Sequence, residues 1–326
     1  MAMAALTERE LASSASLDEL YRRLDIVGMG PGWNKVTPSL WSAPHKTMVP
    51  ARWRYDQARG ALDAAGGLIS TELAERRNLI LFNPIEGNTY ATVRTLVAAY
   101  QMIMPGEWAR EHRHTPNALR LILDAEPGTY TVVDGVSIPM EPGDVLLTPN
   151  WSTHGHGNKS KANAYWLDFL DAPLVQLLEP MFFEPRDRGE GRAQAAPTSK
   201  DSPFVFAYAD TLKRLETAPQ EPSGPFGTSI ELGTPAMQTI ALHMMRLAPR
   251  VRTARLRTTA NNIYAVVRGE GVTTVDGESF DWSRGDVVAA PAWRPHFHQA
   301  SNDAILLRVS DEPAMKSLGF LRFEAQ

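Results

Sequence analysis

Four of the eight histidines in this chain stand in two short clusters that together could hold a metal ion. His112 and His114 lie two residues apart, and His154 and His156 repeat that spacing further along the chain. Side chains two positions apart on a β-strand point to the same face of the sheet, so the first pair can aim two imidazoles into one cavity. A third imidazole from the second cluster would complete one triangular face of an octahedral metal site.

Composition and charge exclude several classes of protein. A hydrophobic fraction of 43% and a charged fraction of 21% are typical of a globular chain, and 326 residues allow two domains. The net charge of −4 gives no general attraction to nucleic acid or to an anionic membrane. The chain has no cysteine, so any metal must be held by nitrogen and oxygen ligands. The N-terminus lacks the apolar stretch of a secretion signal, and no window is apolar enough to span a membrane. We therefore expect a soluble cytoplasmic protein.

Helical patterns are concentrated before residue 93. Residues 1–27 show helical spacing, with Ser16 as an N-cap, and residues 55–78 are predicted as a helix that breaks at its Gly-Gly pair. A short buried strand is predicted over residues 79–82. Residues 174–183 are predicted as a further helix.

Beyond residue 93 the pattern changes to short apolar runs separated by glycine, proline and aspartate. Strands at such spacing are typical of an antiparallel sandwich or barrel. Residues 184–203 are polar and poor in apolar side chains, and we interpret them as a mobile linker. A short helix is expected over residues 208–217, and strands return from residue 239 to the end.

An internal repeat shows that the β-rich part is duplicated. Residues 143–156 align without a gap with residues 285–298. An Asp-Gly hairpin signal also occurs twice, at 134–135 and at 276–277. The first histidine cluster has no copy, because residues 253–257 contain no histidine. One half therefore carries a candidate metal site that the other half lacks.

The two histidine clusters resemble the two motifs of the cupin family in order and spacing. The matching positions are Gly106, His112 and His114 for the first motif, and Gly143, Pro149, His154 and Asn158 for the second. The wider sequence is similar to the bicupin ring-cleaving dioxygenases of the gentisate 1,2-dioxygenase and salicylate 1,2-dioxygenase family. The stretches that carry this resemblance include AERR (74–77), HRHTPNALR (112–120), HGHGN (154–158) and WLDFLD (166–171). The sequence departs from its relatives at the turn 126–128 and at Thr153, where an aromatic residue is usual, so the pocket wall is expected to differ.

The resemblance implies a mainly β fold. It is the bicupin fold, two tandem double-stranded β-helix (jelly-roll) barrels, with an N-terminal helical arm. The expected domains are the arm (1–92), an N-terminal cupin with the metal site (93–183), a linker with a connecting helix (184–236) and a degenerate, metal-free C-terminal cupin (237–326).

The same resemblance assigns the metal ligands. The general cupin pattern places a glutamate ligand shortly after the histidine pair, but residues 117–120 are Asn, Ala, Leu and Arg. An all-histidine site is what the dioxygenase family uses, so His112, His114 and His154 are expected to hold one Fe(2+) per chain, with O2 as co-substrate. The ligand types alone would suit zinc equally well. His156 shares a face with His154 and is the alternative third ligand, but we assign it to the substrate.

Arg120 lies on the same predicted strand face as the first histidine pair. A buried arginine is costly unless it meets an anion. Its fork suits a substrate carboxylate or charge that develops on oxygen, and the alternative is an ion pair with Asp168. We expect catalytic roles for Arg120, His156 and Asp168. Substrate contacts are expected from Arg120, His156, Gln101 and Arg76. For Arg76 and its neighbour Arg77, a solvent-exposed charge pair with Glu75 remains open as the alternative.

The function implied by the resemblance is ring cleavage of a salicylate-type acid, between the carbons that bear the carboxyl and hydroxyl groups. Gentisate, salicylate and 5-substituted salicylates with a nitro or halogen group are the expected small aromatic substrates. Such enzymes serve aromatic catabolism and are expected to be homotetramers. Two other functions remain open: a non-catalytic bicupin that binds a small acid, and a metal-dependent isomerase or decarboxylase that works without O2. His296 and His298 are expected to be structural.

Overall fold

The N-terminal arm forms a unit of its own. The computed structural model describes residues 6–34, 39–74, 76–186, 201–233 and 237–325, and its chain divides into two compact units, 1–45 and 46–326. The first unit contains α1 (Glu8–Ala12) and α2 (Leu17–Ile26). Ser16 caps α2 as predicted, because its side chain accepts a hydrogen bond from the backbone N–H of Glu19. Neither helix contains a buried residue.

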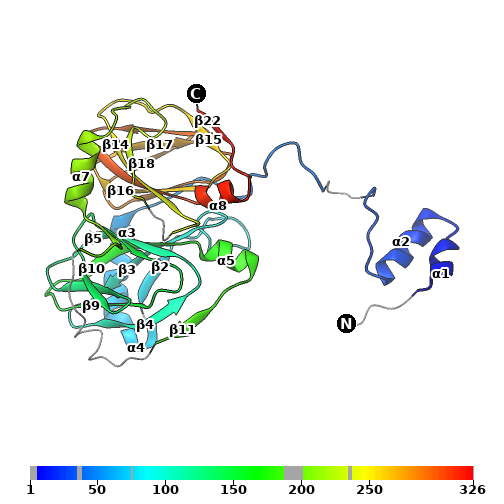
Figure 1. Cartoon of the computed structure of the whole chain (residues 1–326), viewed down its shortest axis with the longest axis horizontal. Coiled ribbons are helices and arrows are strands. Elements are labelled where there is room, and N and C mark those ends of the chain that lie inside the picture. Colours follow the sequence, from blue (N-terminus) through cyan, green and yellow to red (C-terminus); the bar gives the residue numbers. More distant parts are fainter. Residues whose placement is uncertain (1–5, 35–38, 75, 187–200, 234–236, 326) are drawn as a thin grey trace. The chain divides into compact units, whose positions relative to one another are not determined.

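The second unit contains two antiparallel β-barrels, as the bicupin fold predicted (Figure 1). Each barrel consists of a six-stranded and a five-stranded sheet. In the N-terminal barrel the sheets are, in spatial order, β12 (Val205–Phe206), β8 (Val145–Thr148), β5 (Ala118–Asp124), β10 (Ala164–Leu170), β3 (Val97–Ile103), β2 (Arg77–Ile80); and β11 (Phe183–Pro185), β4 (Trp108–His114), β9 (His154–Asn158), β6 (Thr129–Val133), β7 (Val136–Pro139).

The C-terminal barrel repeats this arrangement strand for strand. Its sheets are β1 (Ala51–Trp53), β19 (Val287–Ala290), β16 (Asn262–Arg268), β21 (Ala304–Ser310), β14 (Ala241–Leu247), β13 (Thr228–Glu231); and β18 (Glu278–Trp282), β17 (Gly271–Val275), β20 (His296–Ala300), β15 (Leu256–Thr258), β22 (Phe323–Ala325). The helices among the described residues of the second unit are α3 (Tyr55–Leu68), α4 (Thr71–Ala74), α5 (Ala172–Leu178), α7 (Tyr208–Thr217) and α8 (Glu312–Ser317).

The predicted broken helix over residues 55–78 is confirmed in part: the break falls at residues 69–70, between α3 and α4, and residues 77–78 belong to a strand. Helix α3 continues through Gly66 and Gly67 to Leu68, and the strand β2 begins at Arg77, earlier than the predicted strand over 79–82. Glycine suits position 66 because a Cβ there would lie 2.9 Å from the sulfur of Met104. The helix thus packs closely where the glycines were expected to break it.

The predicted helix over residues 174–183 is too long. Helix α5 ends at Leu178, where Glu179 adopts a left-handed backbone with φ of 71°, and residues 183–185 form β11. The predicted linker over 184–203 falls mostly on residues 187–200, which lie outside the described residues. The predicted helix over 208–217 is confirmed as α7.

The main core lies between the two barrels. One continuous apolar cluster includes Tyr100 and Leu167 from the N-terminal barrel and Ile263 and Leu307 from the C-terminal barrel. These residues belong to the six-stranded sheets, whose other faces line the barrel interiors. Both faces are therefore buried, and strands such as β3 are buried along their whole length.

The segment that precedes each barrel joins the other barrel. Strand β1 precedes the N-terminal barrel but pairs with β19, and β12 precedes the C-terminal barrel but pairs with β8. The helices that follow these strands begin against the same partner. The backbone N–H of Tyr55 donates to Asp286 at 2.8 Å, and that of Tyr208 donates to Asp144 at 2.8 Å. The two barrels are thus joined by a reciprocal exchange of strands.

Glycine is required where these tyrosines meet the barrels. Gly143 and Gly285 have φ of +90° and +89°, a region that favours glycine. A Cβ at Gly143 would lie 2.6 Å from the ring of Tyr208, and one at Gly285 would lie 2.4 Å from the ring of Tyr55. The repeated Gly-Asp pair therefore accommodates the exchanged segment in both barrels.

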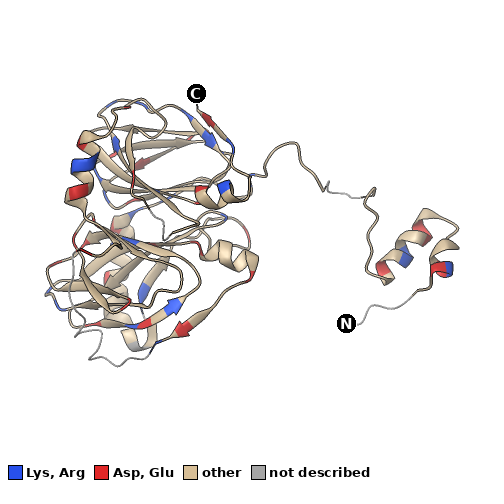
Figure 2. Ribbon diagram, viewed as in Figure 1, with Lys and Arg blue, Asp and Glu red and all other residues tan. Residues whose placement is uncertain are grey.

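Basic and acidic residues are interspersed along the described chain, and most of the ribbon is neither (Figure 2). Many of them form ion pairs, such as Arg52 and Arg54 with Asp281. Among the described helices, none has the length and apolar character needed to cross a bilayer.

Candidate metal centre

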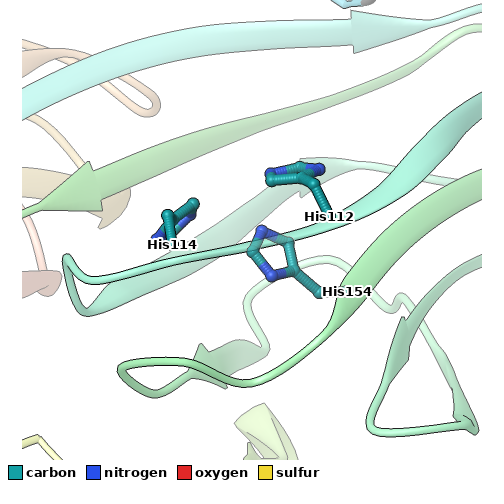
Figure 3. Close-up of side chains that lie close together, drawn as sticks. All are labelled: His112, His114 and His154. Atoms are coloured by element: carbon teal, nitrogen blue, oxygen red, sulfur yellow. The ribbon is translucent and has the colours of Figure 1, made fainter. Parts of the chain in front are cut away.

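Three imidazoles converge in the N-terminal barrel from two neighbouring strands (Figure 3). His112 and His114 lie on β4, and His154 lies on β9, where it is the register partner of His112. One ligand nitrogen from each ring can be chosen so that all three lie within 4.8 Å of one another. Among the described residues, this is the only group of three such side chains close enough to share a metal ion. The structure therefore brings together the three residues that the sequence singled out.

Backbone carbonyls fix the orientation of all three rings. The Nδ1 atom of His112 lies 3.2 Å from the carbonyl oxygen of Arg110. The Nδ1 atom of His114 lies 2.8 Å from that of Pro116, and the Nδ1 atom of His154 lies 3.0 Å from that of Ser152. A carbonyl oxygen only accepts, so each Nδ1 carries the proton and each Nε2 keeps its lone pair. Three neutral Nε2 donors result.

Burial favours the neutral form of these rings. Burial lowers the pKa of His114, and it lowers the pKa of His154 well below the usual value. Burial and then the Arg76 guanidinium lower the pKa of His112 to about 3. All three imidazoles are therefore unprotonated near neutral pH, as metal ligation requires.

Arg76 is the arginine of the AERR stretch that reaches the site. Its Nη2 atom lies 3.1 Å from Nε2 of His112. Its neighbour Arg77 is buried and forms a two-pronged ion pair with Glu107, with distances of 2.6 and 2.7 Å. Residue 75, the glutamate considered as a partner, lies outside the described residues. Of the two arginines, Arg76 is the one that lines the pocket.

A pocket of about 350 Å³ opens beside the histidines. This volume is in the range of small-molecule sites. Its polar wall includes Arg76, Gln101, His114, Arg120, His154 and Asp168. Its apolar wall includes Ile80, Tyr90, Val97, Leu170, Met181 and Phe183. The pocket therefore has both charged and polar groups that suit an acid and apolar groups that suit a ring.

Arg120 is bound within a buried polar network. Only 1% of this residue is exposed, and its Nε donates to Oδ1 of Asp168 at 3.2 Å. Its Nη1 donates to the hydroxyl of Thr131 at 3.0 Å. The other oxygen of Asp168 accepts from the amide nitrogen of Gln101. The ion pair with Asp168 that the sequence left open is present, and Arg120 also lines the pocket.

His156 lies behind this network and is not among the residues that line the pocket. Its Nδ1 atom lies 2.9 Å from the hydroxyl of Thr131. Its Nε2 atom is buried and has no hydrogen-bond partner among the described residues. Its ring centroid is 6.2 Å from that of His154. The predicted contact of His156 with substrate stays a prediction.

The sequence missed part of the pocket wall. Met181 and Phe183 were assigned to a helix, yet they line the pocket beside α5 and β11. The available signal for a role in the pocket wall was that these apolar residues stand directly before the polar stretch 184–203. Thr131 was also missed, since a threonine on a strand has many ordinary roles. Thr153, expected to alter the pocket wall, is not a lining residue, and its backbone N–H donates to Asp134 at 2.8 Å.

The equivalent histidines of the C-terminal barrel have other partners. Nε2 of His296 lies 2.8 Å from the hydroxyl of Tyr264. Nδ1 of His298 lies 2.8 Å from the hydroxyl of Thr273. Burial lowers the pKa of His296 to about 4.

Comparison with known proteins relates this geometry to characterised enzymes. The Cupin domain family matches residues 99–170 and 243–309, one stretch in each barrel. A gentisate 1,2-dioxygenase of Aquipseudomonas alcaligenes is 33% identical over 331 residues, which cover 93% of this chain and 95% of that protein. A 5-aminosalicylate 1,2-dioxygenase of Comamonas sp. is 32% identical, over 95% of this chain and 90% of that protein.

Solved structures give the same result. Salicylate 1,2-dioxygenase from Pseudoaminobacter salicylatoxidans, as its adduct with gentisate, matches with a TM-score of 0.87 and 26% identity. The match covers 100% of this chain and 97% of that chain. The likeness therefore extends over both barrels.

Proposed function

This chain belongs to the bicupin family of gentisate and salicylate ring-cleaving 1,2-dioxygenases, and we propose that it opens the ring of a salicylate-type acid with Fe(II) and O2. It is a ring-cleaving dioxygenase of this family, as the sequence predicted. The substrates named for its relatives are gentisate and 5-aminosalicylate. Gentisate, salicylate and 5-substituted salicylates are the acids that we propose for this chain.

His112, His114 and His154 would hold the iron through Nε2. The donor set fits, because three neutral imidazoles with fixed rings lie close together and no carboxylate of the described residues joins them. Neutral ligands leave the charge of the metal undiminished, which favours an anionic substrate. When bound, Fe(II) supplies open coordination positions and the electrons that make O2 reactive toward the ring.

The chain's own residues bind and orient the acid. Arg76 and Arg120 place two guanidinium groups on the pocket wall, and a guanidinium pairs well with a carboxylate. Arg120 is held in place by Asp168 and Thr131, so it needs no rearrangement when charge develops on oxygen. The apolar wall, with Val97 and Phe183 among its members, would pack on the ring and exclude water.

A single observation carries this proposal: three Nε2 donors lie together, and two of these histidines, His114 and His154, line the same pocket as the buried Arg120. A non-catalytic acid-binding protein needs no such combination, and the named relatives are dioxygenases. An isomerase or decarboxylase that works without O2 is likewise not favoured by these relatives. We also propose that the C-terminal barrel is free of metal, since residues 253–257 contain no histidine and, among the described residues, only the N-terminal barrel brings three possible ligands together.

The proposal also covers the oligomeric state of the protein and its location in the cell. Large apolar side chains are exposed around the end of α5, including Leu177 at 65% and Phe182 at 63%. Such patches mark association surfaces, and we propose a cytoplasmic homotetramer. Light scattering of the purified protein would measure the assembly, and a monomer would contradict it.

The proposed function is tested by oxygen uptake with a panel of acids. The protein would be loaded with Fe(II) and supplied with salicylate, gentisate, 5-aminosalicylate and 5-nitro- or 5-chlorosalicylate. We expect one O2 consumed for each ring opened with at least one of these acids, and no uptake by protein loaded with zinc. If iron-loaded protein consumes no O2 with any of them, the proposal fails.

A further inference from the structure

We propose that the C-terminal barrel positions the metal ligands of the N-terminal barrel through the hydroxyl of Thr239. This residue lies just before β14 and contacts two side chains of the N-terminal barrel, Asn117 and Asp171. The inference rests on the metal centre of the proposed function. It makes Thr239 a positioning residue, and it gives the C-terminal barrel a part in a site built on the other barrel.

Thr239, Asn117 and Asp171 form a closed triangle of hydrogen bonds between the barrels. Nδ2 of Asn117 donates to Oγ1 of Thr239 at 2.9 Å and to Oδ2 of Asp171 at 3.1 Å. The hydroxyl of Thr239 donates to the same oxygen of Asp171. A hydroxyl both accepts and donates, so this one group satisfies the amide and the carboxylate together. Valine has nearly the same shape but can do neither.

Asn117 connects this triangle to both strands that carry metal ligands. The residue before it is Pro116, whose carbonyl oxygen lies 2.8 Å from Nδ1 of His114. Its own Oδ1 accepts from the backbone N–H of Asn150 at 2.9 Å. Asn150 belongs to the turn before β9, and a carbonyl oxygen of that turn lies 3.0 Å from Nδ1 of His154. One amide side chain therefore holds the two backbone segments that orient these rings.

Loss of the Thr239 hydroxyl would disturb Asp171 and Asn117 together. Burial raises the pKa of Asp171, and the hydrogen bonds from Thr239 and Asn117 oppose that rise. Thr239→Val leaves Oδ2 of Asp171 with one donor fewer and places a methyl group against Nδ2 of Asn117. A buried polar group that loses its partner is costly, so the amide must shift to regain one. The backbone segments held by Asn117 would shift with it.

The C-terminal barrel contains the same triangle without a metal ligand beside it. Nδ2 of Asn261 donates to Oγ1 of Thr95 at 3.2 Å and to Oδ2 of Asp311 at 2.8 Å, and the hydroxyl of Thr95 donates to that oxygen. Thr258 stands where His114 stands, since the carbonyl oxygen of each accepts from a tryptophan N–H in the facing turn. Thr95→Val therefore removes an equivalent hydroxyl and serves as the matched control.

The test measures the dissociation constant of Co(II), which binds the same nitrogen donors, on the metal-free full-length protein by calorimetry. The visible absorption of bound Co(II) reports the arrangement of its ligands. Thr239→Val should weaken Co(II) binding about tenfold and change this spectrum, because groups that orient metal ligands alter metal affinity by about 10- to 100-fold. Thr239→Ser keeps the hydroxyl and should bind Co(II) as wild type does. Thr95→Val should also keep wild-type affinity and spectrum, although its Tm falls at least as far as that of Thr239→Val.

A double variant tests whether Thr239 acts through Asn117. Asn117→Ala removes the connection, so adding Thr239→Val to it should weaken Co(II) binding by less than about twofold. A further tenfold loss in the double variant would contradict the proposed route.

The inference is overturned if Thr239→Val binds Co(II) as tightly as wild type. It is also overturned if Thr95→Val weakens binding to the same extent, because the effect would then follow stability rather than position. Loss of affinity in Thr239→Ser would likewise contradict it. None of these measurements uses O2 or an aromatic acid, so the inference can fail while oxygen uptake by wild type supports the proposed dioxygenase function, and the reverse also holds.

Discussion

The two barrels share one scaffold but place different side chains on the strands that face their interiors. In the N-terminal barrel, Arg120 and Asp168 are register partners on β5 and β10. The corresponding pair on β16 and β21 of the C-terminal barrel is Asn262 and Ser310. The ion pair that lines the pocket of the N-terminal barrel is thus replaced by two uncharged side chains in the C-terminal barrel.

The C-terminal barrel nevertheless contains a buried arginine of its own. Arg308 is 1% exposed, and its Nε donates to Asn262 at 2.7 Å while Nη2 donates to Glu312 at 2.7 Å. Its guanidinium also lies 4.4 Å from the centre of the Phe226 ring. This arginine is fully occupied by the protein, whereas Arg120 also borders open space.

Features that recur in both barrels belong to the scaffold. Trp151 and Trp293 both adopt left-handed backbone, with φ of 66° and 60°, in the turn before the second histidine pair. Each ring is covered by an arginine from the neighbouring strand, at 4.3 Å in the N-terminal barrel and 4.6 Å in the C-terminal one. The turns at Trp151 and Trp293 therefore belong to the shared barrel structure, whereas the barrels differ in the side chains that face their interiors.

The largest effect is expected from the histidines themselves. His112→Ala, His114→Ala or His154→Ala should each abolish iron binding and turnover, because two imidazoles cannot replace the triad. The double change His296→Ala and His298→Ala should leave one iron per chain. Metal analysis of the purified variants measures both. Near-normal iron in all three N-terminal variants would contradict the assignment, and loss of iron in the double variant would reveal a second site.

The arginines give the next largest contrast. Arg120→Gln should lower kcat/KM by about 10²-fold or more with iron content unchanged, because a positioned charge on the pocket wall is lost. Arg308→Gln should leave kcat/KM within about threefold and reduce stability by roughly 1 to 3 kcal/mol, since the buried guanidinium loses its hydrogen bonds to Asn262 and to the partly exposed Glu312. Steady-state kinetics and urea unfolding separate the two. Equal loss of activity in both variants would remove the distinction between the barrels.

Acid should destabilise the C-terminal barrel through His296. The folded protein keeps this residue neutral down to a pKa of about 4, whereas the unfolded chain takes up a proton below its usual value of 6.5. Its stabilising contribution is therefore complete above pH 6.5 and is lost as the pH falls toward 4, by roughly 3 kcal/mol at most. Urea unfolding of iron-loaded protein across this range measures it. His296→Gln should show a smaller fall, and an equal fall would exclude His296 as the cause.

The smallest changes in KM and stability are expected when either of two phenylalanines is replaced. Phe183→Ala in the pocket wall should raise KM several-fold with little change in stability, because this side chain is 50% exposed and lines the pocket, with its ring 5.2 Å from that of His112. Phe226→Ala should leave KM unchanged and cost about 1 to 2 kcal/mol, since its ring packs on Arg308. Kinetics and thermal unfolding of both variants would test this. A higher KM in Phe226→Ala would show that the C-terminal barrel contributes to the substrate site.

The histidine pair on β4 was predictable because its information is local, whereas the choice of His154 over His156 rested on the family resemblance. The spacing of His112 and His114 places both on one strand face, and the Asp-Gly turns at 134–135 and 276–277 have the left-handed backbone that the hairpin signal predicted. Arg76 could not be separated from Arg77 in this way. Which of two adjacent arginines faces the pocket depends on where β2 begins, and the sequence predicted that strand two residues too late.

The exchange of strands between the barrels was not predictable from the sequence. The pairing of β1 with β19 joins residues from opposite ends of the chain, and no local pattern in Ala51–Trp53 specifies that partner. The identical positions of Gly143 and Gly285 were visible in the repeat. Their reason, a tyrosine ring from another part of the chain, appeared only in three dimensions.

This exchange has a consequence for the order of events during synthesis on the ribosome. Strand β1 is among the first parts of the second unit to emerge, yet its partner β19 is made near the end. The N-terminal barrel in turn lacks its edge strand β12 until the chain has passed beyond residue 206. An incomplete chain thus exposes an unpaired strand edge, which invites association with other chains. Translation pauses before β19 should therefore lower the yield of this protein more than pauses after it.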